Sequence, residues 1–215
     1  MAKVKDIFGA GISGKVGKVV FFQLNGQTFA RGLPKRQNHP GTPAQELNRK
    51  RFREMQKFSQ QFKFVLIPQV WNFASKTMSG HQLFMSTNNK AFSPDGSVID
   101  PKLIKLSVGK LSLPSSMTVK RLQPGSNVVQ VSWVEEYYNG GVPYWDELLA
   151  ISSGEGFYSE MKNTGIRRGD QQGSFELPAL EVDATHIYLF FGAIEKSKYT
   201  ESMCFELDVN GSGSE

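Results

Sequence analysis

The chain has 215 residues, of which 39% are hydrophobic and 21% charged, so it has enough apolar material for a folded core. Its single cysteine, Cys204, excludes an intrachain disulfide and a zinc site built from several thiolates. No apolar run is long enough for a signal peptide or a membrane-spanning helix, and we therefore expect a cytoplasmic protein that does not bind membranes.

Charge is divided unevenly along the chain. Residues 1–92 contain 15 Lys and Arg but 3 acidic residues, a net charge of +12. Residues 93–215 contain 10 Lys and Arg and 17 acidic residues, a net charge of −7. This asymmetry predicts two modules, the first of which binds a polyanion or an acidic surface.

The chain begins with a glycine-rich segment that fits two phosphate-binding patterns. Gly9 to Gly14 matches G-x-G-x-x-G, and Gly9 to Lys15 matches G-x-x-x-x-G-K. Both patterns require a helix after the glycines, whereas residues 16–22 are β-branched and aromatic and are followed by Asn25-Gly26. We therefore expect a β-hairpin of residues 16–22 and 27–31, and neither a nucleotide nor any other cofactor.

A long basic helix is predicted after an extended linker at residues 34–41. Thr42 suits the N-cap, Pro43 suits the first turn, and Gln45 completes a capping box. Apolar residues then recur on one arc of the helix, at Leu47, Phe52, Met55, Phe58, Phe62 and Leu66. The opposite arc and the linker supply the candidate residues for binding a partner or nucleic acid: Lys35, Arg36, Arg49, Lys50, Arg53 and Lys57.

Arg51 is the exception on this helix, because it projects into the middle of the apolar arc. A guanidinium in such a position must reach water or meet acceptors. We expect Arg51 to be substantially buried and paired with a carboxylate or with backbone carbonyls.

Two shorter helices are predicted next, over residues 69–77 and 80–88, with aromatic side chains in the core. The most linker-like stretch follows at residues 93–97, where Pro94 and Gly96 lie among polar residues and the net charge changes sign. We place the domain boundary there. Residues 1–95 then form a basic β-hairpin and helical module, and residues 101–209 form a second domain.

The second domain has the pattern of an all-β sandwich. Short alternating strands are predicted at residues 103–113, 127–134, 145–152, 156–162, 173–177, 185–194 and 201–209. This number of strands predicts a sandwich of the immunoglobulin or fibronectin type III kind and gives the chain an α+β fold class. Residues 128–133 resemble the second fibronectin type III strand with its core tryptophan, and residues 175–191 resemble the passage into the long sixth strand.

The opening of the chain also carries a recurring motif. Its members are Gly14-Lys15, Gly17, Val19-Val20-Phe21, Asn25-Gly26, Arg31, Thr42, Ala44-Gln45 and residues 49–52. The first 60 residues resemble an uncharacterised protein family found mainly in Bacteroidetes bacteria, with His39 as a departure from the pattern. The resemblance implies no established activity. Similar openings occur in phage-like contexts, which implies a component of a particle or assembly.

Catalytic patterns are absent from the sequence. His39, His81 and His186 lie far apart without metal-ligand spacing, and there is no G-x-S-x-G motif. The acidic pairs Glu135-Glu136 and Asp146-Glu147 flank an aromatic loop whose candidate ligand-binding residues are Tyr137, Tyr138, Tyr144 and Trp145. Two carboxylates facing each other across a cleft would suit a glycosidase, whereas an exposed aromatic loop binds protein or sugar without catalysis.

Three functions remain open at this point. The first is a non-enzymatic interaction or assembly protein whose basic module docks on an acidic surface, including the acidic domain of another copy. The second is non-specific binding of nucleic acid through the basic helix. The third is a carbohydrate-active hydrolase that uses the acidic aromatic loop. We expect the first, with no enzymatic activity.

Overall fold

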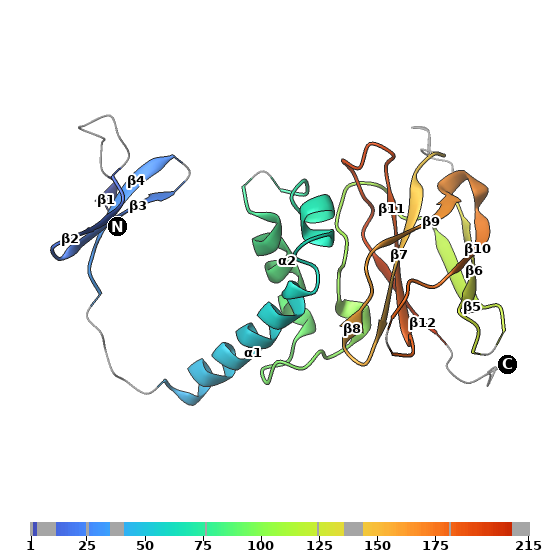
Figure 1. Cartoon of the computed structure of the whole chain (residues 1–215), viewed down its shortest axis with the longest axis horizontal. Helices are drawn as coiled ribbons and strands as arrows, with labels where there is room; N and C mark the ends of the chain where they lie inside the picture. Colours follow the sequence, from blue (N-terminus) through green and yellow to red (C-terminus); the bar gives the residue numbers. More distant parts are fainter. Residues whose placement is uncertain are drawn as a thin grey trace. The chain divides into compact units, whose positions relative to one another are not determined.

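The chain folds into two separate units in the computed structural model, Met1–Thr42 and Pro43–Glu215 (Figure 1). The structure describes residues 2–3, 12–24, 26–34, 41–75, 77–123, 125–135, 144–180 and 182–207. The observed division corrects the predicted boundary near residues 93–101, which lies inside the second unit. The change of charge at that point marks a change from helices to strands within one unit.

The first unit is a four-stranded antiparallel sheet in the order β1-β4-β3-β2. Its strands are β1 (Ala2–Lys3), β2 (Gly14–Val16), β3 (Val19–Leu24) and β4 (Gln27–Gly32). The predicted hairpin is confirmed, because Leu24 pairs with Gln27 and Gly26 has the positive φ of a tight turn. The predicted strand at residues 16–22 is instead two strands, since Gly17 has φ +58° and turns the chain between β2 and β3.

The second unit begins with helices. The predicted basic helix is α1 (Pro43–Gln60), and the predicted helix at residues 80–88 is α2 (Gly80–Asn88), where Ser79 and Gln82 form a capping box. Residues 69–77 do not form the predicted helix; a short π-helical turn, η1 (Ile67–Trp71), occupies part of this region. The 3₁₀ turns η2 (Asn89–Ala91) and η3 (Pro101–Leu103) lead to the strands. None of the helices among the described residues is long and apolar enough to cross a membrane.

Two antiparallel sheets follow in the same unit. One has the order β10-β6-β5, and the other has the order β12-β11-β7-β8, with β9 also paired to β7. Their strands are β5 (Ser116–Arg121), β6 (Val128–Val134), β7 (Glu147–Gly154), β8 (Phe157–Tyr158), β9 (Lys162–Arg167), β10 (Gln172–Glu176), β11 (His186–Gly192) and β12 (Met203–Glu206). A last 3₁₀ turn, η4 (Arg168–Asp170), joins β9 to β10.

The predicted strands agree with these in most cases, and there are three differences. Residues 103–113 form no continuous strand; Leu111 makes an isolated bridge to Thr200. The first strand of the smaller sheet is instead β5, whose exposed and half-buried residues alternate without a strong apolar signal. The strand β9 lies mostly between the predicted strands at 156–162 and 173–177.

The larger sheet lies between the helices and the smaller sheet (Figure 1). Its central strands β7 and β11 are buried on both faces. One face shares a hydrophobic cluster with the smaller sheet, which includes the predicted core residue Trp133, together with Leu148 and Phe191. The other face shares a second cluster with the helical segment, in which Phe190 packs with residues such as Trp71 and Phe84. Residues 101–209 therefore do not contain a complete core, because helices from residues 43–92 cover one face of their main sheet.

Candidate functional site

A row of basic side chains runs along the exposed surface of α1. Arg49, Lys50, Arg53 and Lys57 are all exposed, as predicted, and we call them the basic stripe. Glu54 partly neutralises one of them, because its carboxylate accepts a hydrogen bond of 2.9 Å from Lys57. The other two predicted binding residues, Lys35 and Arg36, lie outside the described residues.

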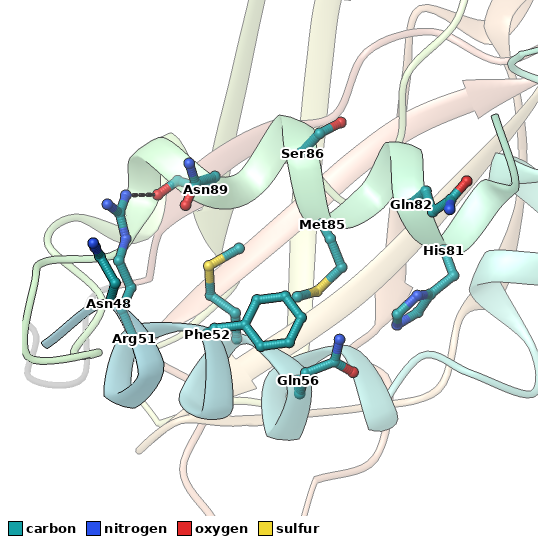
Figure 2. A pocket seen from close by; sticks show the side chains of 10 residues that line it. Asn48, Arg51, Phe52, Gln56, His81, Gln82, Met85, Ser86 and Asn89 are labelled. Carbon is teal, nitrogen blue, oxygen red and sulfur yellow. Dashed lines mark hydrogen bonds between the residues drawn. The ribbon is translucent and has the colours of Figure 1, made fainter. Parts of the chain in front are cut away.

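A groove of about 510 Å³ lies between α1 and α2 (Figure 2). Phe52 from α1 and Met85 from α2 point toward each other across it, and Met55 also lines it. Phe52 is 58% exposed, whereas Met55 and Met85 are buried. The apolar arc predicted for this helix is therefore not buried along its whole length. Gln82 and Ser86 of α2 also line the groove.

Polar side chains define the two ends of the groove (Figure 2). At one end Arg51 is half-buried and donates a hydrogen bond to the backbone carbonyl of Asn89, which confirms one of the two predicted kinds of partner. Its buried Nε has no hydrogen-bond partner among the described residues. At the other end the His81 ring is 3.1 Å from the Ser59 hydroxyl, which donates to the carbonyl of Gln56.

Among the described residues that line the groove, Arg51 of α1 carries a full charge. The helix α2 contains no Lys, Arg, Asp or Glu. Arg49 precedes Phe52 by three residues and Arg53 precedes Gln56 by three, a spacing that makes side chains neighbours on a helix surface. Arg49 and Arg53 of the basic stripe therefore lie beside groove residues on α1, and Arg51 places a positive charge at one end of the groove.

Lys50 also lies near an acidic turn at the end of the helical segment. The Asp95 carboxylate accepts hydrogen bonds from the hydroxyl of Ser93 and from the amide and hydroxyl of Ser97. Together with Lys50, these bonds lower the pKa of Asp95 to about 2. These bonds hold the loop that was predicted to be a domain linker in a compact turn. Here Gly96 has φ +91° and packs against Glu54 of α1.

The aromatic loop is described only at its ends. Tyr137 and Tyr138 lie outside the described residues, whereas Tyr144 and Trp145 are 49% and 60% exposed. The Arg167 guanidinium lies 4.9 Å from the centre of the Trp145 ring. Trp145 also lines a small hollow of about 270 Å³ with Ile194. The described part of this loop therefore presents an aromatic surface, as predicted.

The acidic residues Glu135 and Asp146 lie beside this loop and are the candidate catalytic pair. Both are held by the buried Arg168. Arg168 donates to both oxygens of Glu135, at 2.6 and 3.0 Å, and its Nη1 lies 3.8 Å from Asp146. Burial raises the pKa of Asp146, and Arg168 opposes this effect. Glu147 instead accepts a hydrogen bond from Asn163. Because Glu135 and Asp146 are buried around one cation, they do not face each other across an open cleft, which weakens the case for a hydrolase.

Histidine and cysteine are two other residue types that serve in metal sites and in catalysis. The described residues contain no cluster of His, Cys, Asp or Glu that could hold a metal ion. His186 contacts the hydroxyl of Thr185 at 2.9 Å. Cys204 lies in β12, as predicted, and is half-buried; burial raises the pKa of its thiol to about 11. In comparisons with known proteins, no protein-family model and no curated protein matches this chain.

Proposed function

We propose that this chain is a non-enzymatic interaction or assembly protein that docks an acidic protein surface on the α1–α2 groove and the basic stripe. The observation that carries the proposal is the exposed Phe52, which lines the groove, with the exposed Arg49 one helical turn before it on α1. Large apolar side chains at the centre of a hollow surface, with charges at its rim, are typical of docking sites on proteins.

The arrangement of the strands supports a binding role. We propose that the two sheets form a sandwich of the fibronectin type III kind. The smaller sheet has the order β10-β6-β5, and the larger has β12-β11-β7 with β9 paired to β7. Helices cover the outer face of the larger sheet and carry the groove. Sandwiches of this kind present binding surfaces on a rigid support, and the residues of the surface determine what is bound.

A second copy of the chain is the first partner to test. Residues 93–215 carry the acidic excess of the sequence, and Glu155 and Asp183 line a second hollow of about 590 Å³ together with Arg121. Contact between the basic stripe of one copy and an acidic surface of another would be heterologous, so that copies could add into a ring or a filament. Such a contact suits the assembly role that the opening of the chain implies.

Light scattering at increasing salt concentration tests this proposal. Individual exposed ion pairs are weak, and screening acts over about 8 Å at physiological salt, so the association should decrease steeply as salt rises. Reversal of Arg49, Arg53 and Lys57 to Glu should abolish association at low salt. A matched control reverses the exposed Lys102, Lys110 and Lys120, which makes the same change in net charge outside the basic stripe. Equal effects of both triple variants would show that only net charge matters, and the groove would have no role.

A further inference from the structure

The sheet of the first unit has two chemically different faces. Residues that pair across antiparallel strands point to the same side, and neighbours along a strand point to opposite sides. In the observed register, Val20 pairs with Lys15 on one side and with Arg31 on the other, and Phe22 pairs with Phe29. One face therefore takes two cations and two aromatic rings. The opposite face takes Val16, Val19, Phe21, Ala30 and Thr28, which carry no charge. We call the first of these the basic aromatic face.

The aromatic side chains of this face form a small platform. The rings of Phe22 and Phe29 are stacked, with centroids 5.7 Å apart and planes inclined by 22°. The Arg31 guanidinium lies 5.8 Å from the centre of the Phe22 ring. Both rings are half-buried, and among the described residues no side chain of this unit belongs to either hydrophobic cluster. The rings are thus held in a fixed arrangement by each other and by the hairpin, with surface left for a ligand.

The charge of the unit indicates what kind of ligand this face binds. Its described residues include Lys15, Lys18 and Arg31 but no carboxylate. In the sequence, residues 1–42 contain seven Lys and Arg and one acidic residue, Asp6. Two copies of the sheet would therefore repel each other, whereas a polyanion would be attracted.

We propose that the basic aromatic face binds single-stranded nucleic acid. Bases would stack on Phe22 and Phe29, while Lys15 and Arg31, in the neighbouring row of the sheet, would contact phosphates. Fixed aromatic rings beside cations are the combination that proteins use to bind single strands with little sequence preference. This site is separate from the α1–α2 groove, and the proposal goes beyond the protein docking proposed above.

Fluorescence anisotropy of the full chain with labelled oligonucleotides tests the proposal. We expect binding of dT20 and U20 at low salt, weaker binding of a duplex of equal length, and loss of affinity as salt rises. Phe29→Leu keeps an apolar side chain but removes one ring, and it should weaken binding at least about fivefold, the low end for loss of one base–aromatic stack. Phe21→Leu, on the opposite face, is the matched control and should leave the affinity unchanged.

A second set of variants separates the two surfaces. Reversal of Arg49, Arg53 and Lys57 should leave oligonucleotide binding within about twofold of the wild type. If this reversal abolishes binding while Phe29→Leu does not, nucleic acid binds the helix and the proposal is wrong. If the chain binds no oligonucleotide at low salt, and Phe29→Leu converts an oligomer to a monomer, the face is a protein interface and the proposal is also wrong.

Cross-linking of the unmodified protein gives a result that does not depend on whether the variants fold. Trypsin cleaves after Lys18 and Arg31, so Phe22 and Phe29 leave the protein together in the fragment of residues 19–31. Ultraviolet cross-linking to a bromodeoxyuridine oligonucleotide should modify that fragment. Cross-links confined to fragments of α1 or of the second unit would overturn the proposal.

Discussion

Arg168 and Glu135 form a two-pronged ion pair inside the second unit, with 1% and 7% of their side chains exposed. Asp146 lies 3.8 Å from the same guanidinium, and the centre of the Phe191 ring lies 5.1 Å from it. The carbonyl of Arg168 accepts a hydrogen bond from the Trp133 indole, and its amide donates to the carbonyl of Asp146. One residue therefore holds both described ends of the aromatic loop to the sandwich.

Arg168→Met should destabilise the protein strongly. Removal of the cation leaves Glu135 and Asp146 buried without a counter-charge, and breaking a buried pair in this way costs about 3–5 kcal/mol. The matched control is Arg167→Met, which loses an exposed cation–π contact with Trp145 worth about 0.5–1 kcal/mol. Urea denaturation measures both changes in the free energy of unfolding. Equal losses would show that the buried pair contributes no more than the surface contact.

Arg51→Ala should cost more stability than Arg53→Ala. Arg51 is half-buried and donates to the carbonyl of Asn89, so its removal loses the link between α1 and η2, at about 1–2 kcal/mol. Arg53 is exposed on the basic stripe, and its loss should cost less than about 0.5 kcal/mol. Chemical denaturation of both variants provides the test, and a larger loss from Arg53→Ala would contradict the observed phase of α1.

The fragment of residues 43–215 should fold alone, and the fragment of residues 101–209 should not. The shorter fragment lacks the helices that cover β7 and β11, which would expose Leu149, Ile151, Tyr188 and Phe190. Amide NMR spectra distinguish the two outcomes, because a folded fragment gives sharp, dispersed peaks. A well-dispersed spectrum from residues 101–209 would restore the boundary predicted from the sequence.

The thiol of Cys204 should react slowly at pH 8 and faster as the pH approaches 11. Burial raises its pKa from 9.0 to about 11, so the folded state favours the neutral thiol. The resulting stabilisation is complete below pH 9 and is lost as the pH rises from 9 through 11. Alkylation rates in buffer and in urea provide the measurement, with a difference of about hundredfold expected at pH 8 from the thiolate fractions. Equal rates at pH 8 would contradict the burial of the sulfur.

The sequence predicts local elements better than it predicts their assembly. The hairpin turn at Gly26 and the helix α2 are set by residues close in the chain, and both are confirmed. Phe52 and Phe58 carry the same apolar signal on α1, yet Phe58 is buried and Phe52 is exposed. The difference depends on which side chains of α2 face each ring, and a periodic pattern does not contain that information.

The same limit applies to charge. The excess of basic residues predicted the stripe on α1, but it also suggested a boundary near residue 95 that the folded chain does not have. The sequence does not predict that Arg168 is buried, because its partners Glu135 and Asp146 are 33 and 22 residues away. The structure places Arg168 in the interior, at the point where β9 ends and η4 begins.

The role of the α1–α2 groove as the docking site is the central claim, and the association constant of Phe52→Ser tests it most directly. Phe52 is already exposed in the free protein, so its replacement should leave folding intact. Phe73→Ser is the matched control, since Phe73 is 64% exposed and does not line the groove. Sedimentation equilibrium at low salt should show an association constant at least about tenfold lower for Phe52→Ser, because a partner would bury the Phe52 ring. The association constant of Phe73→Ser should equal that of the wild type. Equal association constants for the two variants, or a wild-type protein that stays monomeric at every concentration, would contradict the claim.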